Sequence, residues 1–254
     1  TCVETLKAEL AAQGIGVGDI RSVLLTHIHL DHAGVTGTLC LENPKIKVYV
    51  HERGAPHMVD PTKLLASAKQ LYGDDMDRLW GDFLAVPQDN VHVLRGGERI
   101  SLGDRELEVA YIPGHASHHV GFLDRSSGVA FVGDTAGVRI GGELFAMPPT
   151  PPPDIDIVTW KASIAQIERW QAQTLFLTHF GPHENPATHL TSLVEHLDGM
   201  ASLARSIMER DVTDEERGDL FGVEFGRYVR RFMPDAAAAL YDQAAPFSQC
   251  WLGL

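Results

Sequence analysis

The residues best suited to chemistry lie in one short segment, residues 27–32, which reads His-Ile-His-Leu-Asp-His. His27 and His29 are two positions apart, so an extended backbone directs both imidazoles to the same side. The preceding run, residues 22–26, is apolar and rich in β-branched residues, which disfavours the alternative of a solvated histidine-rich loop. Imidazole nitrogen and carboxylate oxygen are ligands for zinc, manganese or iron. The segment therefore predicts a metal site at the end of a strand.

Three further polar residues stand at comparable positions, each directly after an apolar strand-like run: His115, Asp134 and His179. Each has an ordinary explanation when taken alone, since an Asp after a strand commonly closes a turn or caps a helix. Together with His27, His29, Asp31 and His32 they supply seven potential ligands. One tetrahedral ion needs four, so the sequence predicts a centre with two metals.

Strands and helices alternate through the region that carries these residues. Apolar or alternating runs predict strands at residues 22–26, 46–50, 91–94, 99–102, 106–112, 120–123, 129–132 and 174–178. Helical spacing predicts helices at residues 5–12, 61–80, 157–167, 190–207 and 221–240. Residues 141–153 contain five prolines and are predicted to form a loop.

This pattern predicts a catalytic αβ core over residues 1–185 and a C-terminal helical extension over residues 186–254, packed on the core. Residues 5–12 read as a helix with no strand before it, so we expect strands to be missing upstream. The last residues, 247–254, are too apolar for a free tail. We expect them to pack on the core or on a partner subunit, which makes a homodimer possible.

Composition bears on partners and compartment. The 254 residues carry a formal net charge of −13, which disfavours nucleic acid as a partner. No apolar run approaches the roughly 18–20 residues that a membrane span requires, so no membrane partner is expected. The cysteines, Cys2, Cys40 and Cys250, form no disulfide or zinc-ribbon pattern. Their spacing is typical of a reducing compartment and predicts a cytoplasmic protein.

The ordered motifs, residues 27–32, Pro113-Gly114-His115, Gly133-Asp134 and Thr178-His179, resemble those of the metallo-β-lactamase-fold hydrolases. The resemblance implies an αββα sandwich, two mixed sheets flanked by helices. It implies a first metal held by His27, His29 and His115. It implies a second metal held by Asp31, His32 and His179, with Asp134 bridging the two. Zinc is the expected metal, with manganese or iron as alternatives.

Such a centre predicts hydrolysis by a hydroxide formed on the two metals. Asp31 and Asp134 are the expected proton carriers for the leaving group. In related motifs a histidine often stands four residues after the ligand, which corresponds to His119, and we expect it to orient a ligand. The role of His118 and of residues 64–80 is left open. The other histidines are expected on the surface or on helix faces: His51, His57, His92, His183, His189 and His196.

The expected substrate is a small ester, lactone, thioester or phosphoester. Asp134 stands where several zinc β-lactamases carry a thiolate, which disfavours a β-lactam. All seven ligands are similar to those of glyoxalase II-like thioesterases and of lactonases. The basic C-terminal residues of the former have no clear match, and no Tyr lies between residues 134 and 179, where some lactonases place one.

Two other classes of function remain open. A persulfide dioxygenase-like oxidoreductase would hold one iron through His27, His115 and Asp134 and leave the second site empty. A non-catalytic metal-binding protein would keep the ligands without turnover.

Overall fold

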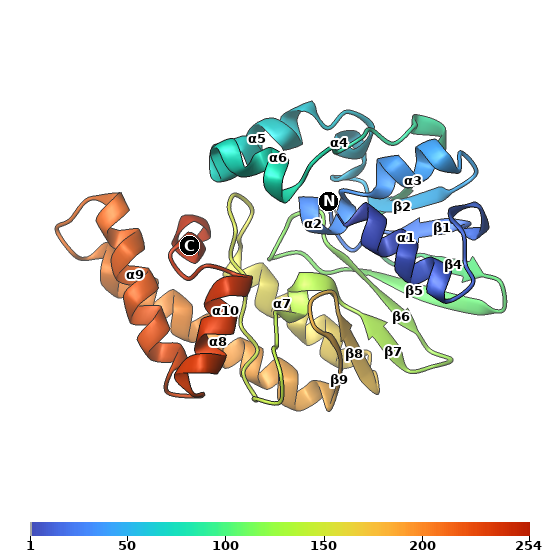
Figure 1. Cartoon of the computed structure of the whole chain (residues 1–254). Coiled ribbons are helices and arrows are strands. Elements are labelled where there is room, and N and C mark those ends of the chain that lie inside the picture. The colour runs from blue at the N-terminus through green and yellow to red at the C-terminus, as the bar shows by residue number, and fades with distance from the viewer. Residues whose placement is uncertain (1) are drawn as a thin grey trace. The chain divides into compact units, whose positions relative to one another are not determined.

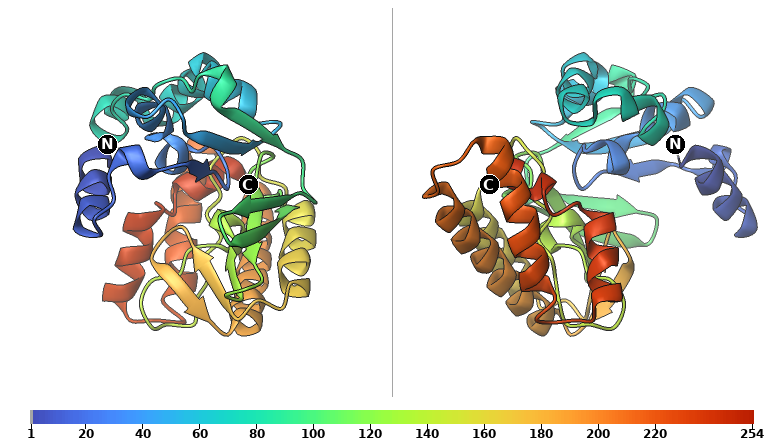
Figure 2. Two further views of the ribbon diagram at one scale, coloured as in Figure 1. Left: turned by 90° about the vertical axis from the view of Figure 1, so that its right-hand side faces the viewer. Right: turned by 60° about the vertical axis from the view of Figure 1, so that its left-hand side comes forward.

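The computed structural model describes residues 2–254 and divides into two compact units, Thr1–Glu98 and Arg99–Leu254. Figures 1 and 2 trace the chain from the blue N-terminal unit to the red C-terminal helices. Each unit has its own sheet and its own apolar core.

The first unit is built on a parallel sheet of three strands in the order β1 (Ser22–Leu24), β2 (Lys47–His51) and β3 (Val91–Leu94). Parallel neighbours require crossover connections, which here are helical. The helices are α1 (Val3–Ala12), α2 (Leu30–Ala33), α3 (Thr36–Glu42), α4 (Ala55–Val59), α5 (Thr62–Tyr72) and α6 (Met76–Leu79), with short 3-10 turns η1 (Val17–Asp19), η2 (Gly73–Asp75) and η3 (Gln88–Asn90).

Alternation along β2 buries Val48 and Val50 completely, as its period-two sequence predicts. The helix predicted over residues 61–80 is split into α5 and α6. Gly73 has φ +53°, a left-handed conformation that ends α5. The partly buried side chains of this helical segment, including Leu64 and Trp80, pack against the core of the first unit.

The second unit contains a six-stranded sheet in sequence order. Its strands are β4 (Arg99–Leu102), β5 (Arg105–Tyr111), β6 (Val120–Asp124), β7 (Val129–Phe131), β8 (Thr174–Leu177) and β9 (Gly181–Glu184). All neighbours are antiparallel except β7 and β8, which are joined through a helix and run parallel. Strand β9 was not predicted, since Gly181-Pro182-His183-Glu184 lacks both apolar alternation and β-branched residues.

Two helices cover one face of this sheet, α7 (Ile157–Arg169) and α8 (Pro186–Met208) (Figure 1). Trp160 and Leu193 are among the fully buried side chains that they contribute to the core. The helices α9 (Asp214–Val229) and α10 (Asp235–Ala244) and the 3-10 turn η5 (Gln249–Gly253) form a second cluster with the end of α8, and η5 lies against α9 (Figure 2).

The C-terminal region is helical, as predicted, but the helix expected over residues 221–240 is broken between α9 and α10. Pro234 stands in this break and precedes α10, where its missing N–H costs no helical hydrogen bond. The predicted boundary at residue 186 stays a prediction. Over residues 2–254, no helix combines the length and the apolar character needed to cross a membrane.

Candidate metal centre

In the first unit, the predicted ligands follow the end of β1. The Leu25 N–H donates to Tyr49 O, which extends the pairing with β2 by one residue. Ile28 is 1% exposed and anchors the segment in the core. Helix α2 begins at Leu30, so Asp31 and His32 lie in its single turn. The extended backbone before α2 thus presents two histidines, and the helical turn presents the other two residues.

The side chains of this segment lie close together. His27 Nε2 is 3.1 Å from His29 Nδ1, and the His27 and His32 rings are 3.9 Å apart between centroids. His32 Nε2 is 3.1 Å from Asp31 Oδ2. Thr26 Oγ1 lies 3.2 Å from His27 Nδ1 and can fix the orientation of that ring. The first unit therefore holds all four of its predicted ligands in one cluster.

In the second unit, the carboxylate of Asp134 lies between two imidazoles. Its Oδ2 is 3.6 Å from His115 Nε2, and its Oδ1 is 3.5 Å from His179 Nε2. The Asp134 and His115 side chains are almost fully buried, whereas the His179 side chain is 32% exposed. One carboxylate oxygen thus faces each histidine, which is the arrangement that a bridging carboxylate requires.

Each of these residues stands at the end of a strand, as the sequence predicted. His115 follows β5 through Gly114, whose φ of +130° is strained for any residue with a side chain. Asp134 lies in the 3-10 turn η4 (Gly133–Ala136) after β7. His179 follows β8 and precedes Phe180, which has φ +66° in the tight connection to β9.

Around His115, buried neighbours fix the ring. Its Nδ1 is 3.0 Å from Pro149 O, and its ring meets the Trp160 ring edge-on at 5.5 Å. His119 is fully buried, with its ring centroid 6.1 Å from that of His115. His118 is also buried. The orienting role expected of His119 stays a prediction.

These separations fit metal ligation. Zinc binds imidazole nitrogen at about 2.1 Å, so two ligands of a tetrahedral ion lie roughly 3.4 Å apart. The distances from His27 to His29, from His115 to Asp134 and from His179 to Asp134 are 3.1, 3.6 and 3.5 Å. The donors are imidazole and carboxylate, which suit zinc, manganese or iron.

The expectation of a surface or helix-face position was wrong for His51, which ends β2 and is 2% exposed. His189 and His196 do lie on a helix face, but it is the buried face of α8. Burial lowers the pKa of His51, and it lowers the pKa of His189 and His196 to about 4. His189 and His196 lie on α8, whose inward face packs into the core, and the sequence pattern could not assign them to that face.

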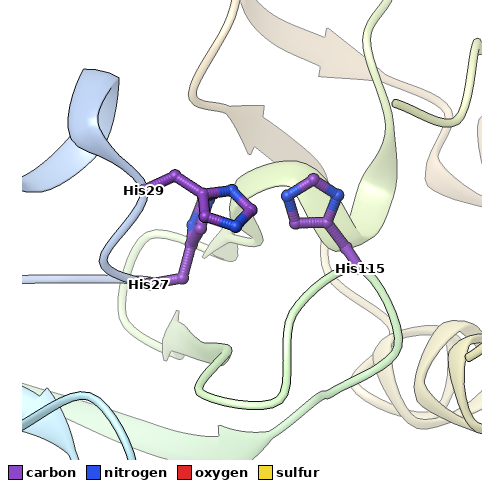
Figure 3. A group of neighbouring side chains, drawn as sticks. All are labelled: His27, His29 and His115. Atoms are coloured by element: carbon purple, nitrogen blue, oxygen red, sulfur yellow. Dashed lines mark hydrogen bonds between the residues drawn. The ribbon is translucent and has the colours of Figure 1, made fainter. Parts of the chain in front are cut away.

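Figure 3 shows the three histidines expected to bind the first metal. His27 and His29 come from the segment between β1 and α2 in the first unit. His115 comes from the segment after β5 in the second unit. Sequence reasoning missed Pro149 and Trp160 as neighbours of His115, because a backbone carbonyl and a core indole carry no motif.

Comparison with known proteins agrees with this architecture. A family model described as the metallo-beta-lactamase superfamily matches residues 2–180. A metallo-beta-lactamase fold-containing protein of Sulfurisphaera tokodaii is 31% identical over 162 residues, 63% of this chain and 60% of the relative. A hydroxyacylglutathione hydrolase of Thermosynechococcus vestitus is 27% identical over 142 residues, 56% of this chain and 44% of the relative. The matched segments are thus about half the length of these relatives.

Among solved structures, a metallo-beta-lactamase family protein of Thermus thermophilus superposes with a TM-score of 0.67 at 22% identity, covering 95% of this chain and 80% of that one. The chain belongs to the metallo-beta-lactamase superfamily. The expected fold, two sheets flanked by helices with further helices at the C-terminus, is confirmed. The superfamily includes metal-dependent hydrolases, and its fold implies binding of divalent metal.

Proposed function

We propose that this protein is a dinuclear metal-dependent hydrolase. The observation that carries the proposal is the Asp134 carboxylate, which directs one oxygen to His115 and the other to His179. In this proposal Asp134 bridges two metals. The first is held by His27, His29 and His115, and the second by Asp31, His32 and His179.

The donor set supports this assignment. In the first unit, His27, His29, Asp31 and His32 form one cluster of donors. In the second unit, Asp134 lies between His115 and His179. Together they contain all seven predicted ligands. A mononuclear site would leave a complete second set of imidazole and carboxylate donors without a role.

Two divalent ions, when bound, supply a water of lowered pKa as nucleophile and polarise the substrate oxygen. The chain's own residues hold and move protons around that chemistry. The side chain of Asp31 is 36% exposed and can exchange protons with solvent. The side chain of Asp134 is 7% exposed and is held between two imidazoles. Asp31 is therefore the better placed of the two to pass a proton to the leaving group.

The substrate class we propose is a small ester, lactone, thioester or phosphoester. The similarity to a hydroxyacylglutathione hydrolase supports a thioester or ester in particular. We propose zinc as the metal and the cytoplasm as the compartment. The three cysteines are all free, with Cys2 exposed and Cys40 and Cys250 buried, which suits a reducing environment. A homodimer without nucleic-acid or membrane partners remains part of this proposal.

The test is metal analysis of the purified protein combined with hydrolysis of a generic ester, lactone, thioester and phosphotriester. We expect close to two metal equivalents per chain and turnover of at least one of these substrates. Asp134→Ala should lose more than about 100-fold in kcat, since the bridging ligand is gone. Asp104→Ala, in the exposed turn between β4 and β5, is the matched control and should keep full activity.

Undiminished hydrolysis by Asp134→Ala would contradict the dinuclear mechanism. A single iron together with oxygen uptake in the presence of persulfides would replace the hydrolase with an oxidoreductase. Bound metal without turnover of any of the four classes would indicate a metal-binding protein.

A further inference from the structure

Trp160, in the first turn of α7, contacts both of the buried ligand-bearing segments of the second unit. It is fully buried. Its Nε1 donates to Thr135 O at 2.7 Å, one residue after Asp134. Its ring meets the His115 ring edge-on at a centroid distance of 5.5 Å and an interplanar angle of 74°. One rigid ring system therefore contacts the His115 ring and the residue that follows Asp134.

The segment before His115 lies directly against α7. A Cβ placed on Gly114 would stand 2.3 Å from Trp160 Cα, so only glycine allows this approach. The Asp156 N–H donates to Gly114 O at 2.9 Å, and Ser163 Oγ donates to Pro113 O at 2.6 Å. The backbone that carries His115 is therefore fixed to α7 on both sides of Trp160.

In the turn that carries Asp134, three successive backbone carbonyls each accept a hydrogen bond. The Gly137 N–H donates to Asp134 O at 2.9 Å, Trp160 donates to Thr135 O, and His189 Nε2 lies 2.7 Å from Ala136 O. Burial lowers the pKa of His189 to about 4, so the ring is neutral at pH 7, and the nitrogen facing the carbonyl carries its proton. Trp160 is thus the central donor of the three and the one that also contacts His115.

We propose that Trp160 is a positioning residue for the metal centre: it fixes His115 and Asp134 relative to one another so that both can bind the same ion. This inference rests on the function proposed above. The separation that it maintains is the 3.6 Å between His115 Nε2 and Asp134 Oδ2. Partners that orient ligands in this way typically contribute about 10- to 100-fold to metal affinity.

A general packing role would be shared by Trp170, which provides a matched control. Trp170 is 7% exposed and belongs to the same apolar cluster as Trp160. Its ring lies near Gly121 of β6. Replacing either tryptophan by phenylalanine removes similar volume from one core, but only Trp160→Phe removes the hydrogen bond to Thr135 O.

The experiment compares the full-length wild type, Trp160→Phe and Trp170→Phe by competition for Zn²⁺ with a chromogenic chelator. Urea denaturation of the metal-free proteins reports how much each change destabilises the fold. We expect Trp160→Phe to bind Zn²⁺ about 10- to 100-fold more weakly than wild type, with Trp170→Phe unchanged. Cobalt-loaded Trp160→Phe should also show an altered visible spectrum, because the ligand geometry changes.

Wild-type affinity in Trp160→Phe, or an equal loss in Trp170→Phe, would overturn the proposal. If Trp160→Phe does not fold, Trp160→Tyr, which also lacks the indole N–H that donates to Thr135 O, takes its place in the same comparison, and wild-type affinity in that variant would overturn the proposal. Zn²⁺ affinity is measured without substrate, so it does not depend on hydrolysis. A wild type that binds zinc but hydrolyses none of the substrates would contradict the proposed hydrolase, and the comparison with Trp160→Phe would still test the role of Trp160. A wild type that binds no metal overturns both.

Discussion

The Nδ1 atom of His115 lies 3.0 Å from the carbonyl oxygen of Pro149, and both are part of the buried interior of the second unit. A carbonyl only accepts hydrogen bonds, so Nδ1 is the nitrogen that carries the proton in the neutral ring. The lone pair is then on Nε2, the atom that faces Asp134 Oδ2 at 3.6 Å. The fold selects the tautomer in which His115 can bind a metal.

Because the fold holds His115 ready to bind a metal, we expect removal of metal to lower both the activity and the stability of the protein. An ion that binds only the folded state stabilises it by about 2.7 kcal/mol at 100 times its Kd. Treatment with a chelator should therefore abolish hydrolysis and lower the Tm, and added Zn²⁺ should restore both. Differential scanning calorimetry with and without Zn²⁺ measures the shift. An unchanged Tm after verified metal removal would argue against ions binding to the folded protein.

The variant Asp31→Asn should distinguish the two predicted metal sites, because it changes a ligand of only one of them. Asp31 is 3.1 Å from His32 Nε2 and belongs to the second site alone in the proposed assignment. We expect the variant to lose about one of two metal equivalents and at least about tenfold in kcat. Metal analysis by plasma mass spectrometry checks this, with Asp104→Asn as the control. Retention of both equivalents with full kcat would remove Asp31 from the centre.

The loop that carries Pro149 is tied to the end of the chain. Thr150 Oγ1 donates to Cys250 O at 2.8 Å, and Thr150 is fully buried. Thr150→Val keeps the shape but leaves that carbonyl unpaired, so the free energy of unfolding should fall by about 1–3 kcal/mol. Thr191→Val on the exposed face of α8 should change it by less than about 0.5 kcal/mol. Equal effects of the two changes in urea denaturation would refute the role of this bond.

Stability should fall in mild acid because of two buried histidines. Burial lowers the pKa of His189 and His196 from 6.5 to about 4, so the unfolded chain binds their protons first. The contribution of these two neutral histidines to the free energy of unfolding is thus fully present above pH 6.5 and is lost as the pH falls toward 4. By pH 5 each histidine accounts for a loss of about 2 kcal/mol.

A variant isolates this contribution. His196 Nδ1 lies 2.9 Å from Tyr228 Oη, and His196→Gln keeps a hydrogen-bonding group there without a titrating ring. Between pH 7.5 and pH 5, its free energy of unfolding should fall by about 2 kcal/mol less than that of wild type. Urea denaturation at both pH values gives the comparison. The same fall in both proteins would mean that His196 does not contribute to the acid sensitivity.

Local sequence determined where the predicted ligands stand. Period-two spacing put His27 and His29 on one side of an extended backbone, and apolar runs placed His115, Asp134 and His179 directly after β5, β7 and β8. These features depend on neighbours in the chain, so they can be read from a single sequence. For the same reason, every strand of the six-stranded sheet except β9 was predicted.

Tertiary structure decided what surrounds those ligands. Strand β9 exists because β8 offers a pairing edge, although its own sequence has little strand propensity. Helical spacing could not show that His189 and His196 face the core, because that depends on what packs against α8. The contacts of Trp160 with the His115 and Asp134 segments join parts of the chain 25 or more residues apart through a backbone carbonyl and a ring face. Every residue has a carbonyl, so residue types cannot reveal which one accepts, and only the packed fold selects it.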